Sequence, residues 1–270
     1  MDSIFKGYID ESYNPRYFAL SCLFAKGLNW MWFLQDWESV LRAKNAELEK
    51  EARPRISRFH ATYCSTGYGE FSDWPPDERI ALTKELLKVF DKPSNSLTVS
   101  SYAVNLKDLT EIMPQSAGDS KALAYSLLLK FVMVEIGNMF AEANKGDTSN
   151  IKITLVHDRC AYNGVLQTAF DGLLNDETFR FKSIFTNLDP MGWEDCLALQ
   201  PADLIAYENC KEADRQGLRP DMDMRRSLQY LLGPNSTFNG RSKGFLKENI
   251  EQLKRLMDAR TSAALKAHVE

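Results

Sequence analysis

The first 25 residues constrain the fold most, because they contain two apolar runs that only a short polar turn separates. The first run ends in the segment Gly7-Tyr8-Ile9-Asp10-Glu11-Ser12, and it is rich in the β-branched and aromatic residues that favour strands. The second run, at 16–25, has the same character, and the turn between them contains Asn and Pro. The pattern predicts an antiparallel hairpin whose first strand ends in two acids.

The rest of the chain alternates between helical and strand-like patterns. Helical spacing of apolar residues occurs near 28–51, 77–90, 119–144 and 161–174 and again after Pro201, and strand-like runs lie at 97–104, 151–156 and 181–186. Strand, helix and strand over 151–186 form a crossover unit, which is expected to be parallel and right-handed. This order predicts an α/β fold in which helices flank a mixed five-stranded sheet.

The domain organisation follows from the same patterns. We expect residues 1–213 to form one α/β domain, with an unpatterned loop insertion at about 52–76, because single hydrophobic cores extend to about 250 to 300 residues. Residues 214–270 are expected to form a helical C-terminal extension that packs on the same domain, with its longest helical pattern at 243–268.

Composition and charge exclude several classes of protein. The chain is 44% hydrophobic and 26% charged, which is ordinary for a folded soluble protein. A net charge of -4 gives no global attraction to nucleic acid or anionic membranes, so any phosphate-bearing partner must bind at a local patch.

Five scattered cysteines argue against a disulfide framework and a structural zinc site. No run approaches the roughly 18 apolar residues of a membrane span, and the N-terminus has no apolar signal core. We therefore expect a cytoplasmic protein without a membrane partner, and the oligomeric state stays open.

Three aspartates lie where the predicted topology can bring them together. Asp10 ends the first strand, Asp158 ends the strand at 151–156, and Asp203 lies near the start of the helix at Pro201. If the fourth strand pairs beside the first and parallel to it, both strand-end acids reach one edge of the sheet and the helix delivers the third. Carboxylate oxygens are the ligands that Mg²⁺ and Mn²⁺ prefer, and paired ions about 3.5 to 4 Å apart stabilise the attacking and leaving oxygens of a phosphodiester. Side chains alternate along a strand, so we expect only one of the two neighbouring acids to face the site, and we select Asp10. Glu11 is expected to assist the three aspartates.

Five further residues are candidates for supporting roles. His60 suits a general acid or base, a phosphate contact or a metal ligand, with a structural role as the alternative. Arg53, Arg55 and Arg58 form the best local phosphate patch, unless they are a solvated charge run. Gln200, one helical turn before Asp203, could contact substrate or orient that carboxylate through a hydrogen bond, or it could cap the helix.

Three segments resemble a known family. They are the opening Tyr-Ile-Asp-Glu-Ser at 8–12, the step Phe59-His60-Ala61, and the segment 199–207 (LQPADLIAY). They are similar to the family catalogued as domain of unknown function 3800, which looks like a branch of the ribonuclease H-like superfamily, and the resemblance spans about residues 4 to 210. It implies a ribonuclease H-like α/β domain with a metal-dependent nuclease-type site.

The expected function is therefore hydrolysis of phosphodiester bonds in nucleic acid, with two Mg²⁺ or Mn²⁺ ions held by Asp10, Asp158 and Asp203 and assisted by Glu11 and His60. Two alternatives stay open. One is a catalytically inactive member that binds nucleic acid or a partner protein, as a component of a mobile-element or phage-defence system. The other is a hydrolase of nucleotides or other small phosphoesters.

Overall fold

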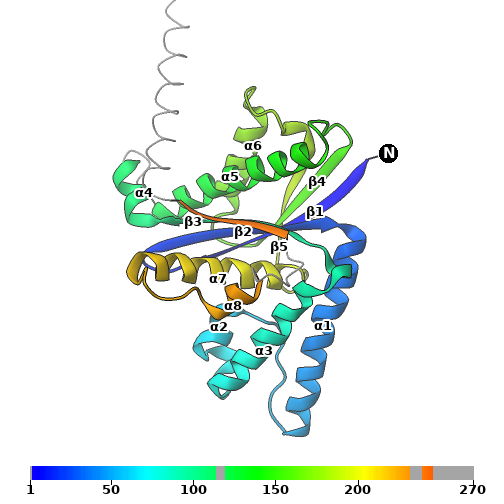
Figure 1. The fold of residues 1–270 in the computed structure, drawn as a ribbon, viewed down its shortest axis with the longest axis vertical. Coiled ribbons are helices and arrows are strands. Elements are labelled where there is room, and N and C mark those ends of the chain that lie inside the picture. Colours follow the sequence, from blue (N-terminus) through cyan, green and yellow to red (C-terminus); the bar gives the residue numbers. More distant parts are fainter. Residues whose placement is uncertain (1, 114–118, 232–238, 246–270) are drawn as a thin grey trace, which may run out of the picture.

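A mixed six-stranded sheet runs through the molecule, with helices packed on both of its faces (Figure 1). The computed structural model describes residues 2–113, 119–231 and 239–245. The strand order is β5-β4-β1-β2-β3-β6. The strands are β1 (Ser3–Tyr13), β2 (Tyr17–Lys26), β3 (Thr98–Asn105), β4 (Ile151–Asp158), β5 (Phe185–Met191) and β6 (Asn239–Phe245). The helices are α1 (Gly27–Lys50), α2 (Ala61–Thr66), α3 (Pro76–Lys88), α4 (Leu106–Ile112), α5 (Ser120–Ala143), α6 (Asn163–Asn175), α7 (Leu199–Leu218) and α8 (Arg226–Leu231).

The strand pairings confirm the predicted antiparallel hairpin and the parallel pairing of the two crossover strands. β1 and β2 pair antiparallel, as do β2 and β3, whereas β4 is parallel to both β1 and β5. Ile9 lies opposite His157 in the last pair of the β1–β4 ladder, so Asp10 and Asp158 follow side by side where this pairing stops. The prediction that Asp10 ends the first strand is wrong, because β1 continues to Tyr13 and Asp10 pairs with Ser21 of β2. The five strands predicted from the sequence are therefore present, and helices flank them on both sides.

Alternation along the strands divides the core into two layers. Tyr8 and Leu23 pack on the face covered by α1, α3 and α7, whereas Ile9 and Cys22 pack on the face covered by α4, α5 and α6. Figure 1 shows these two groups of helices on opposite sides of the sheet. Successive side chains of a strand point to opposite faces, so both layers are drawn from the same short segments.

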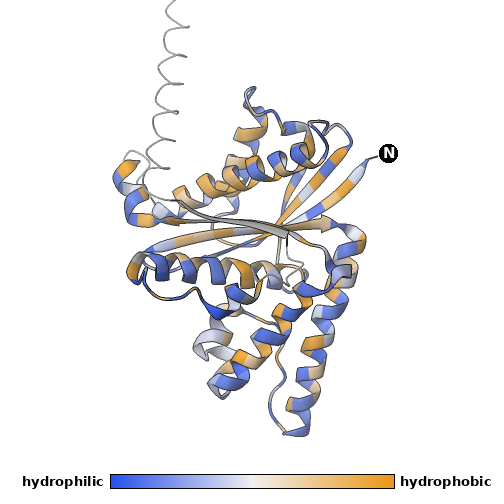
Figure 2. Cartoon of the chain, in the orientation of Figure 1, coloured by the Kyte–Doolittle hydropathy of each residue, from blue (hydrophilic) through white to orange (hydrophobic). Residues whose placement is uncertain are grey.

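Helix α5 is the most apolar helix of the core. Figure 2 shows hydrophobic residues along its length, and within the described residues it is the helix whose length and composition would allow it to cross a membrane. Lys130 and Glu135 interrupt its apolar residues, which is why no uninterrupted apolar run of that length stands out in the sequence. Most of this stretch is buried inside the domain, as expected for the core helix of a soluble α/β protein.

Three elements differ from the sequence-based prediction. β5 occupies 185–191 rather than 181–186, and residues 182–184 form a 3-10 turn instead. A sixth strand, β6, pairs parallel with β3, so the helix predicted from residue 243 is wrong at its start; its remainder lies outside the described residues. The unpatterned segment 52–76 contains α2 and a 3-10 turn at Gly69–Phe71, which are too short to show a helical period.

The boundary predicted after residue 213 falls inside α7, which continues to Leu218. Beyond α7, Leu228 and Leu231 of α8 join the same apolar core as α1 and α3. The described part of the C-terminal segment is thus packed on the domain, although it contributes a strand as well as a helix.

Candidate functional site

A concave site of about 340 Å³ lies beside the carboxyl-terminal part of β1, at the carboxyl end of β4 and the start of α7. Its walls come from the end of β1, the segment 58–63, the end of β4, the loop that contains Trp193, and the first turns of α7. Seven of the nine residues selected from the sequence line it. They are Asp10, Glu11, Arg58, His60, Asp158, Gln200 and Asp203.

The three aspartates reach the cavity by the predicted route. The parallel β1–β4 register places Asp10 and Asp158 next to each other, just beyond the last residue pair of the two strands. Helix α7 packs on one face of the sheet against β1, β2 and β3 and contributes Asp203. The Oδ2 atom of Asp203 accepts a hydrogen bond of 2.7 Å from the backbone N–H of Ala61. This bond also joins the start of α2 to α7, so both walls of the cavity hold the carboxylate in place.

Glu11 lines the same cavity as Asp10, contrary to the expectation that only one of them would face the site. Its backbone N–H donates to Asp10 Oδ1 over 2.8 Å, and the two side chains interact directly. Alternation does send the two residues toward different faces of the sheet. The cavity lies beside β1 beyond its last pair with β4, where this side of β1 has no neighbouring strand, and both residues line it.

Four carboxyl groups thus share one partly enclosed volume. Burial raises the pKa of Asp10 well above its ordinary value, and the charges of Glu11, Asp203 and Asp158 raise it further. Burial also raises the pKa of Asp203 to about 7, even though the Ala61 N–H favours the ionised form. The pKa of Asp158 is raised by burial and then by Glu11, and the guanidinium of Arg58 opposes this shift. The site therefore carries more negative charge than the protein groups around it compensate.

His60 lies against Asp203, with 3.5 Å between its Nδ1 and Asp203 Oδ2. Burial and the nearby charge of Arg58 lower the pKa of His60 to about 4, so the imidazole is neutral near pH 7 and the two side chains are not an ion pair. The buried Nδ1 has no hydrogen-bond partner in the part of the chain that the structure describes. A neutral imidazole nitrogen in this position is suited to accept a hydrogen bond or to bind a cation, whereas its low pKa makes it a weak proton acceptor near pH 7.

Gln200 has a positioning role in the structure. Its Oε1 accepts hydrogen bonds from Trp37 Nε1 (3.2 Å) and from the backbone N–H of Phe59 (3.1 Å). It therefore does not cap its helix, which has no side-chain cap bond at Ala198. Through these bonds it connects α7 to α1 and to the segment that carries Arg58 and His60.

The predicted arginine patch is divided by the fold. Arg58 lines the cavity, where its guanidinium lies 3.9 Å from the ring centroid of Trp193. Arg53 forms ion pairs with Glu51 and Glu78, and Arg55 pairs with Glu49. Neither of these two arginines lines the cavity, so only Arg58 is placed to meet a ligand there.

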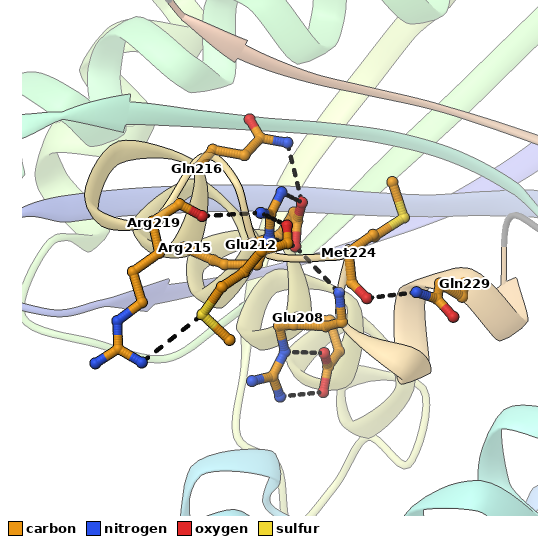
Figure 3. Close-up of polar contacts among 9 residues, drawn as sticks. Glu208, Glu212, Arg215, Gln216, Arg219, Met224 and Gln229 are labelled. Carbon is orange, nitrogen blue, oxygen red and sulfur yellow. Dashed lines mark hydrogen bonds and ion pairs between the residues drawn. The ribbon is translucent and has the colours of Figure 1, made fainter.

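Buried ion pairs fix the far half of α7 (Figure 3). Glu208, which is 3% exposed, accepts hydrogen bonds of 2.8 and 3.2 Å from the guanidinium of Arg225. Glu212 pairs with Arg215 over 2.6 Å and accepts a bond from Gln216 over 3.0 Å. These contacts tie the segment after α7 back onto the helix, and they hold the helix whose first turns carry Gln200 and Asp203.

Aromatic residues at the cavity were not among the candidates from the sequence. Tyr13, Tyr63 and Trp193 all line it. Tyr13 follows the two acids of β1 directly, and Trp193 lies in the loop before α7, so proximity to a site acid along the chain was the available signal. Tyr63 gave no such signal, because its place depends on how α2 packs against α7.

The donor set fits a divalent cation in chemistry. Four carboxyl groups with little positive charge near them and a neutral imidazole with a free Nδ1 are the ligand types that hold Mg²⁺ or Mn²⁺. Within the described residues, however, no group of three or more His, Cys, Asp or Glu side chains is arranged so that it could hold a metal ion as it stands. Binding would therefore require these side chains to rearrange around the ion.

No protein-family model matches the sequence, and no curated protein is significantly similar to it.

Proposed function

We propose that this protein is a divalent-metal-dependent nuclease of the ribonuclease H-like type, related to the domain of unknown function 3800 family. The observation that carries the proposal is that Asp10, Asp158 and Asp203 line one cavity together with Glu11, beside the carboxyl end of β4. The mixed sheet flanked by helices supports it, since this is the architecture that the sequence resemblance implies.

In this proposal Asp10, Asp158 and Asp203 hold two Mg²⁺ or Mn²⁺ ions, and Glu11 and His60 complete the donor set. The chemistry that such ions supply when bound is activation of water and neutralisation of charge on the phosphodiester. Arg58 binds a non-bridging phosphate oxygen, because its guanidinium is the cation that the cavity presents beside the acids. The backbone N–H of Ala61 donates to Asp203, and that of Phe59 donates to Gln200. These two bonds hold the walls of the cavity in a fixed relative position during turnover.

The test is cleavage of labelled single-stranded, double-stranded and hybrid nucleic acids in Mg²⁺ or Mn²⁺, with EDTA as the blank. We expect Asp10→Asn, Asp158→Asn and Asp203→Asn each to reduce cleavage at least 100-fold, because each removes a negatively charged ligand from the cation site without a large change in shape. Asp171→Asn is the matched control, since Asp171 is exposed on α6, where its Oδ1 accepts a hydrogen bond from Gln167. The activity of this variant should equal that of the wild type.

Other results would decide for the alternatives. Metal-dependent activity on nucleotides but not on polymers would identify a small-phosphoester hydrolase. Binding of nucleic acid with no cleavage in either metal would identify a non-catalytic member of the fold, and the nuclease proposal would then be rejected. Cleavage that survives in EDTA, or in Asp10→Asn, would also contradict it.

A cytoplasmic location suits this function. All five cysteines lie within the described residues and are free, and burial raises the pKa of Cys22 and Cys64, so these thiols stay protonated and unreactive.

A further inference from the structure

Three aromatic rings at the mouth of the cavity each carry a cationic or imidazole group. The guanidinium of Arg58 lies over Trp193 at 3.9 Å, and the Lys121 ammonium lies over Tyr13 at 3.8 Å. The ring of Tyr63 stacks on His60, with centroids 4.2 Å apart and an angle of 8° between the planes. The rings come from β1, α2 and the loop before α7, so the fold gathers them from three separate segments.

One of these walls continues outward to solvent. Tyr68 packs edge-on against Tyr63 at 5.0 Å and is 64% exposed. Gly67, with φ of 70°, ends α2 in the left-handed conformation and turns the chain so that Tyr68 returns to Tyr63. An aromatic path therefore leads from His60, beside Asp203, through Tyr63 to an exposed ring.

Electrostatics alone would not hold a nucleic acid at this site. The chain has a net charge of -4, the cavity contains four carboxyl groups, and Arg53 and Arg55 are paired with glutamates elsewhere. Binding of a polynucleotide by backbone neutralisation requires several free cations. The rings supply a different source of affinity, because every base has a face that stacks on an aromatic side chain.

The geometry favours unpaired bases. In a duplex the base faces are stacked on one another, and an enzyme that contacts them must take the nucleotide out of the helix. A cavity of about 340 Å³ has the size of a small-ligand pocket and accommodates a nucleotide rather than the side of a double helix.

We infer that the substrate is an unpaired strand of nucleic acid, whose bases stack on Trp193 and on the Tyr63–Tyr68 wall while a phosphodiester lies at Asp10, Asp158 and Asp203. This inference rests on the proposed function for the position of the phosphodiester, but the stacking itself does not depend on cleavage.

The test measures binding by fluorescence anisotropy in Ca²⁺, with fluorescein-labelled 12-nucleotide probes of DNA and RNA. The probes are a single strand, the same strand in a duplex, and a strand of equal length in which the central nucleotides are abasic. We expect the intact single strand to bind at least tenfold more tightly than either of the other two, because the duplex stacks its bases on one another and the abasic strand lacks the central bases. The DNA and RNA arms show which sugar the site accepts.

The matched variants are Tyr68→Ala and Trp193→Ala, each compared with its Phe counterpart. Loss of a ring is expected to weaken binding of the intact strand about tenfold, and replacement by Phe is expected to retain most of the affinity. Trp32→Ala is the control, because Trp32 is 40% exposed on α1 and does not line the cavity. Tyr68 is on the surface, so its substitution should leave the fold unchanged by circular dichroism.

The two proposals fail in different ways. Equal affinity for intact and abasic strands, tighter binding of the duplex, or no binding of any strand would overturn the stacking inference, even if the protein cleaves nucleic acid. Selective binding of the intact strand that is lost in Tyr68→Ala would support it, even if no cleavage occurs and the nuclease proposal falls.

Discussion

Asp203 is a carboxyl group that the fold buries beside three others. It is 9% exposed, and burial raises its pKa to about 7. Its folded pKa is above the ordinary value of an aspartate, so the folded protein binds the extra proton and is favoured at low pH. This contribution is present below about pH 4 and is lost as the pH rises toward 7.

Replacement of Asp203 by asparagine should therefore stabilise the metal-free protein. In EDTA at pH 8 we expect Asp203→Asn to raise the free energy of unfolding by about 1–3 kcal/mol, because the amide has no charge to bury and its oxygen still accepts from Ala61. The gain should shrink as the pH falls toward 4. Thermal unfolding by calorimetry across this pH range measures both effects.

Asp214, farther along the same helix, gives the opposite control. A hydrogen bond from Arg16 lowers the pKa of Asp214, so its charge stabilises the folded state. Asp214→Asn should lower stability slightly at pH 8. A loss of stability in Asp203→Asn at pH 8 would show that the buried charge of Asp203 does not destabilise the folded protein.

For single residues, the sequence predicts the acids of the site better than it predicts the residues around these acids. Asp158 ends β4 as predicted, and parallel pairing brings it beside Asp10, which a pattern of apolar runs can predict. Asp10 itself lies within β1, because pairing with β2 extends that strand to Tyr13. The separation of Arg58 from Arg53 and Arg55 could not be predicted, because it depends on glutamates of α1 and α3 that compete for the arginines. The ring of Tyr63 was missed for the same reason, since only tertiary packing brings α2 to the site.

Among the elements, α5 packs closely at Gly137 against the segment before β5. A methyl group at this position would overlap the ring of Phe181. Alanine is the better helix former by about 1 kcal/mol, but the overlap in a filled core outweighs that preference. The absence of a side chain at Gly137 thus sets the distance between α5 and the segment before β5.

The expected result is that Gly137→Ala lowers the free energy of unfolding by about 1–3 kcal/mol, as overpacking does. Gly172 in α6 is the matched control, because a methyl group there meets no atom within 4 Å. Gly172→Ala should raise the free energy of unfolding by about 0.5–1 kcal/mol. Denaturant titrations of both variants measure the difference, and a stabilising Gly137→Ala would contradict the packing argument.

The elements that were predicted wrongly have unfavourable local composition. β5 contains Asn187, Asp189 and Pro190, which are typical of turns. It can include a proline because it is the edge strand next to β4, where one side of its backbone needs no partner. β6 also lies at an edge, beside β3, and contains two glycines. In both cases the sheet overrides local preference, whereas the central strands β1, β2 and β4 match their sequences.

For the molecule as a whole, the proposed cation site predicts that stability depends on divalent ions. An ion that binds the folded protein and not the unfolded chain stabilises it in proportion to the logarithm of its concentration. The carboxyl groups of the cavity come from both halves of the chain, so the unfolded chain does not contain this site.

We therefore expect Mn²⁺ or Mg²⁺ at 100 times its dissociation constant to stabilise the protein by about 2.7 kcal/mol. The corresponding rise in melting temperature is roughly 5–10 °C, and EDTA should reverse it. K⁺ at equal ionic strength should have little effect, and Asp10→Asn should remove most of the shift. Differential scanning fluorimetry makes the measurement; an unchanged melting temperature in both divalent ions would argue against a metal site.

The contribution of α7 to the cavity also affects biosynthesis. A ribosome completes Asp10 early and Asp203 only after every central strand of the sheet has been translated. Until then a nascent chain lacks one wall of the cavity. If the complete protein cleaves nucleic acid, we expect a nascent chain without α7 not to cleave the RNA around it during translation. Truncated products that end before α7 are expected to lack this activity as well.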